Sequence, residues 1–469
     1  MLVDYEKAFD FANRAVIVSD MMKHELGDTF VRAVAEMYEE TTYIPKTDQR
    51  SLGDPISTRY GVTQGRRSST GLFSFLIRDM ADTVNTNVAY EDFMEPHNLA
   101  QMADDTILAA ELRESLGGKF GTVKLFSDEK KQSVNVEKTL FIHMSKSPDT
   151  EPILCNNDTV SISSLDPGKS SPYLGEHLIH THDLHDIIQY NLNKRMFNIA
   201  KYKAWLDVNE TTPFGIKLQV LDSCVLKAVL YGAEAWGDLS AFASKLELIE
   251  LDLLKSALGV KKGTPTNLVY HELGRGSITA KIMDLQHSFI QKLDQMTEEE
   301  ALVKCLWNKS QHLDIAHYYN TLNNNNYKTN IIERTQFLHT SERSLDTRYR
   351  NIIGLDEKNC IYDSYCCDTY RTILTRWRLS NYELAIETGR YVNPPIDREQ
   401  RTCRTCLVME DENHVFFVCP LYNDIRRDHP LLFEKTITDI LNPTSKDVLY
   451  ETANVLFEIE KIHKKYNGT

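Results

Sequence analysis

The stretch Leu99–Ala110, which reads LAQMADDTILAA, places two adjacent aspartates, Asp104 and Asp105, between two short apolar runs. Apolar runs of this length around a polar pair predict a tight β-hairpin whose strands are buried on at least one face. Two carboxylates at the tip of such a hairpin are costly to desolvate without a counter-charge, and a divalent metal ion would supply one. The same pair also suits a turn without any metal, because Asp bonds its own backbone there. Both interpretations stay open on these residues alone.

A third carboxylate stands near the start of the sequence. Asp4 ends a short apolar run in MLVDYEKAFD. Three carboxylates that converge from two strands form the arrangement that two-metal phosphoryl or nucleotidyl transfer requires. We therefore consider Asp4 together with the Asp104–Asp105 pair as a candidate metal site.

Length and composition describe an ordinary globular chain. Its 469 residues, 42% of them hydrophobic and 26% charged, predict roughly two to four domains. No apolar run of about 18 residues is present, so we expect no membrane span. Met1 leads directly into LVDYEKAFD without a basic segment or a cleavable apolar segment, so we expect no signal peptide and an intracellular protein.

Charge and cysteine content limit the partners. The net charge of −14 argues against non-specific binding of nucleic acid by the whole surface, although a local basic groove is compatible with it. Nine cysteines, an odd number, favour reduced thiols, some of them on a metal, over a disulfide framework.

The first half of the chain mixes strands and helices. A helix is predicted from Asp28 to about Thr41, with Phe30, Val34, Met37 and Tyr38 as its apolar stripe. Next, GVTQG forms a glycine-rich loop before a helical segment. Such a loop offers backbone N–H groups to an anion or allows close approach to a ligand backbone.

Beyond the Asp-Asp hairpin, SVNVEKTLFIHM carries a β-like run beside Lys138, and PYLGEHLI predicts another pair of short strands. From about Asp183 the pattern becomes helical, and Gly259 is the predicted end of one helix. The histidines 177, 180, 182 and 185 do not share one helix face, which favours a solvated loop over a metal site.

The most specific chemical pattern is CRTCLVMEDENHVFFVC. Cys403 and Cys406 form a C-x2-C turn that aims two thiolates at one ion, and His414 with Cys419 completes a tetrahedral structural zinc site. The alternative is a set of isolated reduced thiols in a core.

Arginines and aromatic residues alternate before and within this module. This pattern suits phosphate contacts combined with base stacking, and it equally suits a solvated helix face whose aromatic rings pack inward. The residues concerned are Arg371, Arg376, Arg378, Arg390, Arg398, Arg401 and Arg404, with Tyr370, Trp377, Tyr382 and Tyr391.

Taken in order, these motifs resemble the reverse transcriptase of LINE-type (non-long-terminal-repeat) retrotransposons. LVDYEKAFD resembles the first catalytic motif, GVTQG the second, MADD the third and VNVEKT the lysine-bearing fourth. PYLG resembles the hairpin that grips the primer, and VLYGAEAWG and LVYHELG resemble segments downstream of the polymerase core. CRTC…H…C resembles the C-terminal zinc knuckle, so the resemblance covers nearly the whole chain.

The resemblance implies an α+β fold. A polymerase palm, an antiparallel sheet with helices on one face, would be followed by a helical thumb and a mostly α-helical C-terminal region with a small zinc module. The implied segments are a partial palm at 1–180, a thumb or connection at 181–260, a helical region at 261–395, a CCHC zinc knuckle at 396–430 and a helical tail at 431–469.

The resemblance also implies catalytic roles. Asp4, Asp104 and Asp105 would hold two Mg²⁺ (or Mn²⁺) ions. One ion would lower the pKa of the primer 3′-hydroxyl, and the other would hold the incoming triphosphate and stabilise the leaving pyrophosphate. Lys138 would lie near the phosphates as a general acid.

Substrate contacts follow from the same comparison. Phe9 would pack under the sugar and exclude a ribose 2′-hydroxyl, and Gln64 and Gly65 would contact the template strand and the nascent base pair. Tyr173 and Gly175 would belong to the hairpin that grips the primer. The implied partners are an RNA template, a DNA primer or target and deoxynucleoside triphosphates, with no membrane. The Cys/His module would bind Zn²⁺ and help to hold element RNA or target DNA.

The chain departs from the family pattern in three places. Arg66 and Arg67 replace the usual Cys-Pro, and Met102 replaces a frequent Tyr or Phe. The sequence also starts at the first catalytic strand, without preceding fingers or an endonuclease domain. We therefore expect Asp4 on a fraying edge strand and polymerase activity that is weak or absent. The alternative function is a non-catalytic nucleic-acid-binding remnant; either protein would work in the nucleus or cytoplasm and would not be secreted.

Overall fold

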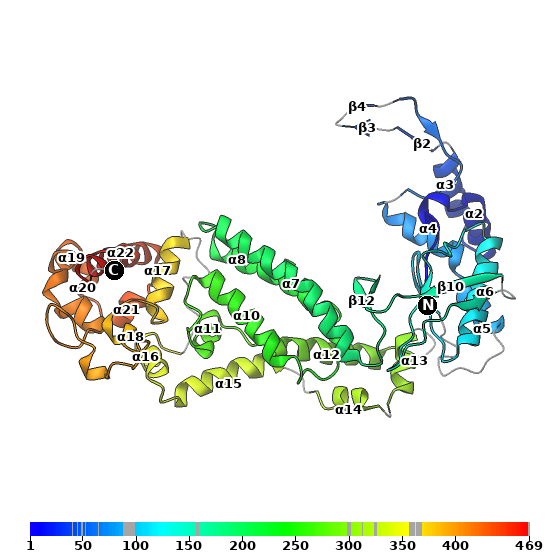
Figure 1. Ribbon diagram of the computed structural model, residues 1–469. Helices are drawn as coiled ribbons and strands as arrows, with labels where there is room; N and C mark the ends of the chain where they lie inside the picture. The colour runs from blue at the N-terminus through cyan, green and yellow to red at the C-terminus, as the bar shows by residue number, and fades with distance from the viewer. Residues whose placement is uncertain are drawn as a thin grey trace. The chain divides into compact units, whose positions relative to one another are not determined.

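The computed structural model describes most of the chain (Figure 1): residues 1–39, 41–44, 46–47, 50–51, 53–63, 65–87, 99–155, 159–297, 302–311, 313–322, 326–355, 362 and 368–467. The chain forms two compact units. The first comprises Met1–Asn191 with Met296–Lys309, and the second comprises Leu192–Gln295 with Ser310–Thr469. The predicted α+β fold is confirmed, because the first unit contains a sheet with helices and the second is helical.

A six-stranded sheet organises the first unit. Its strand order is β6-β7-β1-β8-β10-β9, and every neighbouring pair is antiparallel except β8 and β10, which run parallel. The predicted antiparallel sheet is therefore correct for four of the five pairs. The strands are β1 (Leu2–Val3), β6 (Leu99–Met102), β7 (Asp105–Leu108), β8 (Leu140–Phe141), β9 (Ile153–Cys155) and β10 (Val160–Ser164).

The strand that carries Asp4 lies inside this sheet. β1 pairs with β7 on one side and with β8 on the other. The expectation of an edge strand at a fraying terminus is therefore wrong. Met1 and Val3 are buried in the core of the unit, and the pairing on both sides holds the strand in place.

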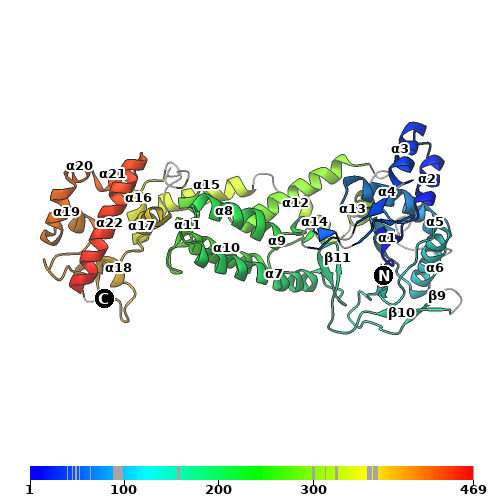
Figure 2. The ribbon, with the colours of Figure 1, turned by 90° about the horizontal axis from the view of Figure 1, so that it is seen from above.

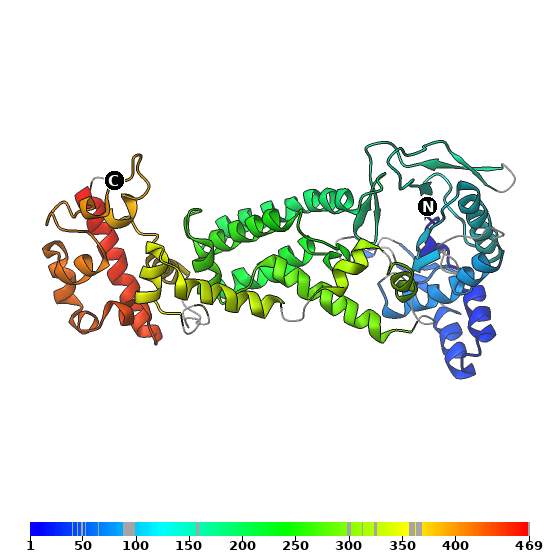
Figure 3. The same cartoon turned by 90° about the horizontal axis from the view of Figure 1, so that it is seen from below.

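Helices cover the sheet and fill the rest of the first unit. α5 packs against α6 and β6, and α6 also lies against β7 and β9. Figure 3 shows the first unit from below. Phe120 and Val123 of α6 are completely buried in this core. The helices are α1 (Ala8–Phe11), α2 (Arg14–Lys23), α3 (Asp28–Glu39), α4 (Arg67–Ile77), α5 (Met80–Asn87), α6 (Arg113–Glu129) and α13 (Leu302–Lys309).

The predicted helix at 28–41 is confirmed as α3, but its predicted apolar stripe is only half correct. Val34 and Tyr38 are buried with Val31, whereas Phe30 is 55% and Met37 is 40% exposed. The remaining strands form three two-stranded sheets: β2 (Thr42–Tyr43) with β5 (Ile56–Ser57), β3 (Lys46–Thr47) with β4 (Arg50–Ser51), and β11 (Ser171–Tyr173) with β12 (Glu176–Leu178).

The second unit is built of helices. α7 (Leu184–Val208) begins in the first unit, and α10 (Ala243–Leu258) ends at Gly259 in the left-handed conformation, as predicted. The others are α8 (Phe214–Val220), η1 (Leu221–Leu226), α9 (Lys227–Val229), η2 (Ala233–Ala235), α11 (Thr266–Leu273), α12 (Ile278–Gln295), α14 (Asp314–Asn320), α15 (Asn326–Thr340), α16 (Ser344–Ile352), α17 (Asp368–Arg378), α18 (Ala385–Thr388), η4 (Arg398–Gln400), η5 (His414–Val418), η6 (Pro420–Tyr422), α19 (Asn423–Asp428), α20 (Pro430–Phe433), α21 (Ile437–Leu441) and α22 (Lys446–Asn467).

Aromatic and ionic contacts join the C-terminal helices. α22 packs along α17 (Figure 2), where Tyr370 lies edge-on to Tyr450 at 5.0 Å between ring centroids. The indole N–H of Trp377 donates to Glu460 at 3.2 Å. None of the helices in the described ranges combines the length and the apolar character needed to cross a bilayer.

Candidate functional site

The pairing of β1 with β7 brings the predicted catalytic aspartates to one place. Val3 pairs with Thr106, so Asp4 follows β1 beside the residue at which β7 begins, Asp105. Asp104 lies in the two-residue turn between Met102 and Asp105, as the predicted hairpin requires. The geometry of the hairpin and the central position of β1 therefore gather three carboxylates at one end of these strands.

The electrostatics of the three carboxylates show that they influence one another. Burial raises the pKa of Asp4, which the charge of Lys138 opposes and the charge of Asp104 reinforces. Burial also raises the pKa of Asp105, and the charges of Asp104 and Asp4 add to it. A cation that binds these three carboxylates would reduce their mutual repulsion and so stabilise their charged forms. The three side chains are not among the described groups whose ligand atoms lie within 4.8 Å of one another, so a shared ion would require these side chains to move closer together.

A turn beside β8 holds Asp4 in position. The Asp4 backbone N–H donates to Oγ1 of Thr139 at 3.2 Å, and its carbonyl accepts from the Asn135 N–H at 2.8 Å. Lys138 lies within this turn, its own N–H donating to Oδ1 of Asn135 at 3.2 Å. Lys138 was predicted from the sequence, whereas Asn135 and Thr139 were not; the Asn in VNVEKT, a residue suited to turns, was the available signal.

The predicted primer-gripping hairpin also lies near this site. Burial raises the pKa of Tyr173, and the charge of Asp105 raises it further. The end of β11 therefore lies close enough to Asp105 for an electrostatic interaction. The turn after Tyr173 contains Leu174 at φ 47° and Gly175 at φ 86°, the backbone of a tight two-residue β-turn. Tyr173 and Gly175 thus belong to a hairpin, as predicted, and their contact with a primer stays a prediction.

The glycine-rich loop packs on α1. The Phe9 ring stacks on Phe73 of α4 with 4.9 Å between centroids, and the Phe9 carbonyl accepts from the Val62 N–H at 2.8 Å. Gly61 has a φ of 87°, and a Cβ at this position would lie 2.6 Å from the Asp10 carbonyl oxygen, so only glycine allows this contact. Gly65 is exposed before α4. Gln64 lies outside the described residues.

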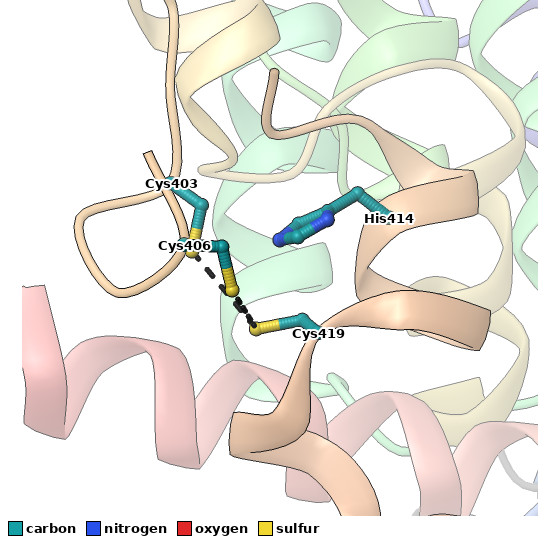
Figure 4. Close-up of side chains that lie close together, drawn as sticks. All are labelled: Cys403, Cys406, His414 and Cys419. Atoms are coloured by element: carbon teal, nitrogen blue, oxygen red, sulfur yellow. Dashed lines mark hydrogen bonds between the residues drawn. The ribbon is translucent and has the colours of Figure 1, made fainter. Parts of the chain in front are cut away.

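The second candidate site is the Cys/His cluster (Figure 4). The ligand atoms of Cys403, Cys406, His414 and Cys419 all lie within 4.8 Å of one another, and Figure 4 shows the four side chains pointing toward a common centre. The Sγ atom of Cys419 is 3.9 Å from that of Cys403 and 3.6 Å from that of Cys406. Tetrahedral zinc with Zn–S bonds of about 2.3 Å separates its sulfur ligands by roughly 3.8 Å. The spacing therefore matches a zinc site.

Backbone hydrogen bonds shape this cluster. The C-x2-C turn closes through the Leu407 N–H, which donates to the Cys403 carbonyl at 2.8 Å, and the Cys403 N–H donates to Val408 at 2.8 Å. His414 and Cys419 lie at the two ends of a π-helical turn, joined by the Cys419 N–H to the His414 carbonyl at 2.7 Å. Such turns shift the positions of side chains and are frequent at functional sites.

One polar atom of the cluster lacks a partner. Nε2 of His414 is buried and has no hydrogen-bond partner among the residues that the structure describes. Burial, with smaller contributions from the neighbouring thiols, raises the pKa of Cys406 and Cys419, so these thiols keep their protons unless a cation replaces them. A zinc ion would provide a partner for His414 and would stabilise the thiolates, so these four residues could hold zinc.

One residue that supports the cluster was not predicted. The Arg426 guanidinium donates to the carbonyls of Val415 and Phe416 at 3.2 and 3.0 Å and also to the carbonyl of Cys419. It therefore satisfies the carbonyls at the end of the π-helical turn. Arg426 carries no motif of its own, so the sequence offered no signal for it.

The arginine and aromatic pattern has a structural explanation for its central members. Arg371 pairs with Asp368 at 2.8 Å, and Arg378 pairs with Glu272 at 2.5 Å; both arginines are buried. Trp377 and Tyr382 are also buried, at 0% and 1% exposed. These two aromatic rings thus pack inward, whereas Tyr391 is 69% exposed. Arg371 and Arg378 form internal ion pairs and lie neither on a solvated face nor at a nucleic-acid interface.

The histidine-rich segment is only in part the predicted solvated loop: His182 and His185 are exposed, but His177 and His180 are not. His177 lies in β12, with Nδ1 3.0 Å from Oγ of Ser170, and Nε2 of His180 lies 2.8 Å from the Leu165 carbonyl. These two rings are half-buried and hydrogen-bonded to neighbouring segments. Sequence spacing alone could not show these contacts.

Comparison with known proteins adds no assignment. No family model matches the chain, and no curated protein matches it. The two sites are therefore interpreted from their own geometry and chemistry.

Proposed function

We propose that this chain is an RNA-directed DNA polymerase of the LINE-type reverse transcriptase class. The observation that carries the proposal is the meeting of Asp4, Asp104 and Asp105 at one end of β1 and the β6–β7 hairpin. Lys138 and Tyr173 lie within electrostatic reach of the same carboxylates. Three mutually repelling carboxylates at strand ends suit oxygen-coordinated divalent cations such as Mg²⁺ or Mn²⁺.

The proposed reaction joins a deoxynucleotide to a primer on an RNA template. The primer 3′-oxygen forms a bond to the α-phosphorus while the bond to the bridging oxygen breaks and pyrophosphate leaves. The 3′-hydroxyl proton passes to solvent, and the Lys138 ammonium donates a proton to the leaving pyrophosphate. Bound Mg²⁺ or Mn²⁺ would supply the Lewis acidity for both oxygens. Asp4, Asp104 and Asp105 would hold these ions.

Other residues of the first unit would select and orient the substrates. Phe9, fixed by its stacking on Phe73, would exclude a ribose 2′-hydroxyl. The β11–β12 hairpin with Tyr173 and Gly175 would hold the primer end, and Gly65 would approach the template.

Primer extension tests the proposal. Purified chain with a primed RNA template, deoxynucleotides and Mg²⁺ or Mn²⁺ should give extended primer at a low rate, and Asp104→Ala should lower that rate by about 100-fold or more, as loss of an essential electrostatic group does. Asp82→Ala, which removes an exposed carboxylate on α5, is the matched control and should extend normally. Extension that survives Asp104→Ala at the wild-type rate would reject the assigned site.

A specific observation also favours a second function. The Cys/His cluster fits a zinc ion, and a zinc module can hold nucleic acid without any polymerase chemistry. A non-catalytic nucleic-acid-binding protein in the nucleus or cytoplasm would bind RNA or DNA in a salt-sensitive way. Cys406→Ser would abolish that binding, whereas Asp105→Ala would leave it intact. Binding that is insensitive to both changes would exclude this role for the cluster.

A further inference from the structure

A cavity of about 370 Å³ lies in the second unit, outside both candidate sites. It is bounded by the loop after α10, the segment after α17 and the short helix α18. Pro265, Leu345 and Leu379 give it apolar walls, and Glu387 and Tyr391 also line it. Its volume and its mainly apolar lining with few polar groups are typical of a small-ligand site.

Glu387 is the unusual residue of this cavity. It is only 3% exposed, and Nε of Arg390 lies 3.0 Å from its Oε2 atom. Burial raises the pKa of Glu387 to about 7; the charge of Arg390 opposes the shift and that of Glu412 adds to it. Carboxylates are rarely buried in this way, because desolvation must be offset by donors. Further N–H donors from a ligand would stabilise this carboxylate.

Two other polar side chains of the cavity, Asn381 and Tyr382, are already hydrogen-bonded within the fold. Oδ1 of Asn381 accepts from the Lys261 N–H at 2.7 Å and from Oγ1 of Thr264 at 2.9 Å, and its Nδ2 donates to Leu379 at 2.8 Å. The Tyr382 hydroxyl donates to Glu412. These bonds hold the side chains of Asn381 and Tyr382 in place, whereas the carboxylate of Glu387 can accept hydrogen bonds from a ligand.

The mouth of the cavity carries an open aromatic ring and a positive charge. Tyr391 is 69% exposed, so its ring is accessible for stacking. Lys261 is exposed and also lines the cavity. A planar ring with an attached phosphate would satisfy both groups, because aromatic faces stack on bases and ammonium groups attract phosphate.

We propose that this cavity binds a guanine base. Guanine presents two adjacent N–H donors, N1–H and N2–H, along one edge, and a carboxylate accepts such a pair in a bidentate arrangement. Adenine and neutral cytosine would instead direct a ring-nitrogen lone pair at Glu387. An alkylammonium ligand would be repelled by Lys261 at the mouth. The base could belong to a free nucleotide or to a single strand, and all the residues involved lie in the second unit, so the inference does not depend on the polymerase proposal.

Calorimetric titration of the full chain with the four nucleoside monophosphates tests the assignment. GMP should bind about tenfold or more tightly than AMP, the discrimination expected of one bidentate edge contact. Glu387→Gln should remove this preference, because an amide has a single acceptor oxygen and its NH2 group would face one of the two N–H donors. Glu383→Gln, an exposed neighbour outside the cavity, is the matched control and should keep it. Tyr391→Ala alters an exposed ring and should weaken all four nucleotides similarly through lost stacking.

Oligonucleotides distinguish the source of the base. A thymidine oligomer with one guanine should bind in preference to the same oligomer with one adenine if the ligand belongs to a strand, whereas a preference limited to GMP identifies a free nucleotide. Either result supports the assignment when Glu387→Gln abolishes it. Equal binding of GMP and AMP, or a guanine preference that survives Glu387→Gln, would overturn it. A trimethyllysine peptide serves as the alkylammonium alternative. Its binding, together with no preference for guanine, would also overturn the assignment.

Discussion

Replacement of Arg378 by methionine should destabilise the second unit strongly, because it leaves a buried charge without its partner. Arg378 is 3% exposed, and its Nε atom lies 2.5 Å from Oε1 of Glu272, which is 2% exposed. Burial by itself would raise the pKa of Glu272, but the Arg378 charge, helped by the hydroxyls of Tyr349 and Tyr362, holds this pKa below its usual range. The ion pair thus keeps a carboxylate ionised in the core.

The structure gives the size of the effect. Truncating one partner of a buried ion pair costs about 3–5 kcal/mol. Arg378 also donates to the Leu441 carbonyl at 2.8 Å, and leaving a buried carbonyl unpaired costs about 1–3 kcal/mol. The double variant Arg378→Met with Glu272→Gln removes the stranded charge, and glutamine still accepts from Tyr362. We therefore expect the double variant to recover about 2 kcal/mol or more relative to Arg378→Met alone.

Urea unfolding followed by tryptophan fluorescence measures both variants, because Trp377 is completely buried near this pair. Arg427→Met is the matched control, since Arg427 is 75% exposed in a surface pair with Asp424 and should change the free energy of unfolding by less than about 1 kcal/mol. A cost below about 1 kcal/mol for Arg378→Met, or a double variant no more stable than the single one, would refute the reasoning.

Three further predictions concern other parts of the chain. Gly61→Ala should lower the free energy of unfolding by about 3 kcal/mol and Gly65→Ala by only about 1 kcal/mol, because both have positive φ but only the first meets a backbone oxygen, that of Asp10; urea titrations check the difference. Elemental analysis should find one zinc ion per chain and none in Cys406→Ser, and chelation should lower the midpoint of thermal unfolding; metal-free wild-type chain of equal stability would contradict this. The protonated side chain of Glu387 contributes stability below its ordinary pKa of 4.5, and this contribution is lost as the pH rises through about 7. The free energy of unfolding of Glu387→Gln should therefore rise by about 3 kcal/mol relative to wild type between pH 4.5 and 7, and a pH-independent difference would contradict this.

Local patterns in the sequence were sufficient for local structure. Short apolar runs on either side of Asp104 and Asp105 predicted the β6–β7 hairpin, and the spacing of Cys403 with Cys406 predicted the metal-ligand cluster, because in both cases the partners are near in sequence. The structure places Asp4 beside them through β1, a pairing between distant segments that only the order of the motifs suggested.

Interactions between distant segments explain the predictions that failed. β1 was expected at an edge, but Leu2 also pairs with Leu140, and nothing near Leu2 indicates that partner. Arg378 was considered for phosphate binding as part of the arginine and aromatic pattern. That local pattern could not show its ion pair, because the partner Glu272 lies on another helix. Phe30 was placed in an apolar stripe, yet helical periodicity does not show which side of a helix a neighbouring element covers.

The two hydrogen bonds between the Asp4 peptide and the Asn135–Thr139 turn have an evolutionary consequence. They fix the first aspartate and Lys138 as one unit, so adding or deleting a single residue between Asn135 and Thr139 would displace the lysine by about one strand step of 3.3 Å. Length variation should therefore be tolerated in the exposed segment from Lys146 to Thr150, and excluded from the Asn135–Thr139 turn that precedes it. Among natural variants of this chain, insertions and deletions should therefore occur in the exposed segment and not in the turn.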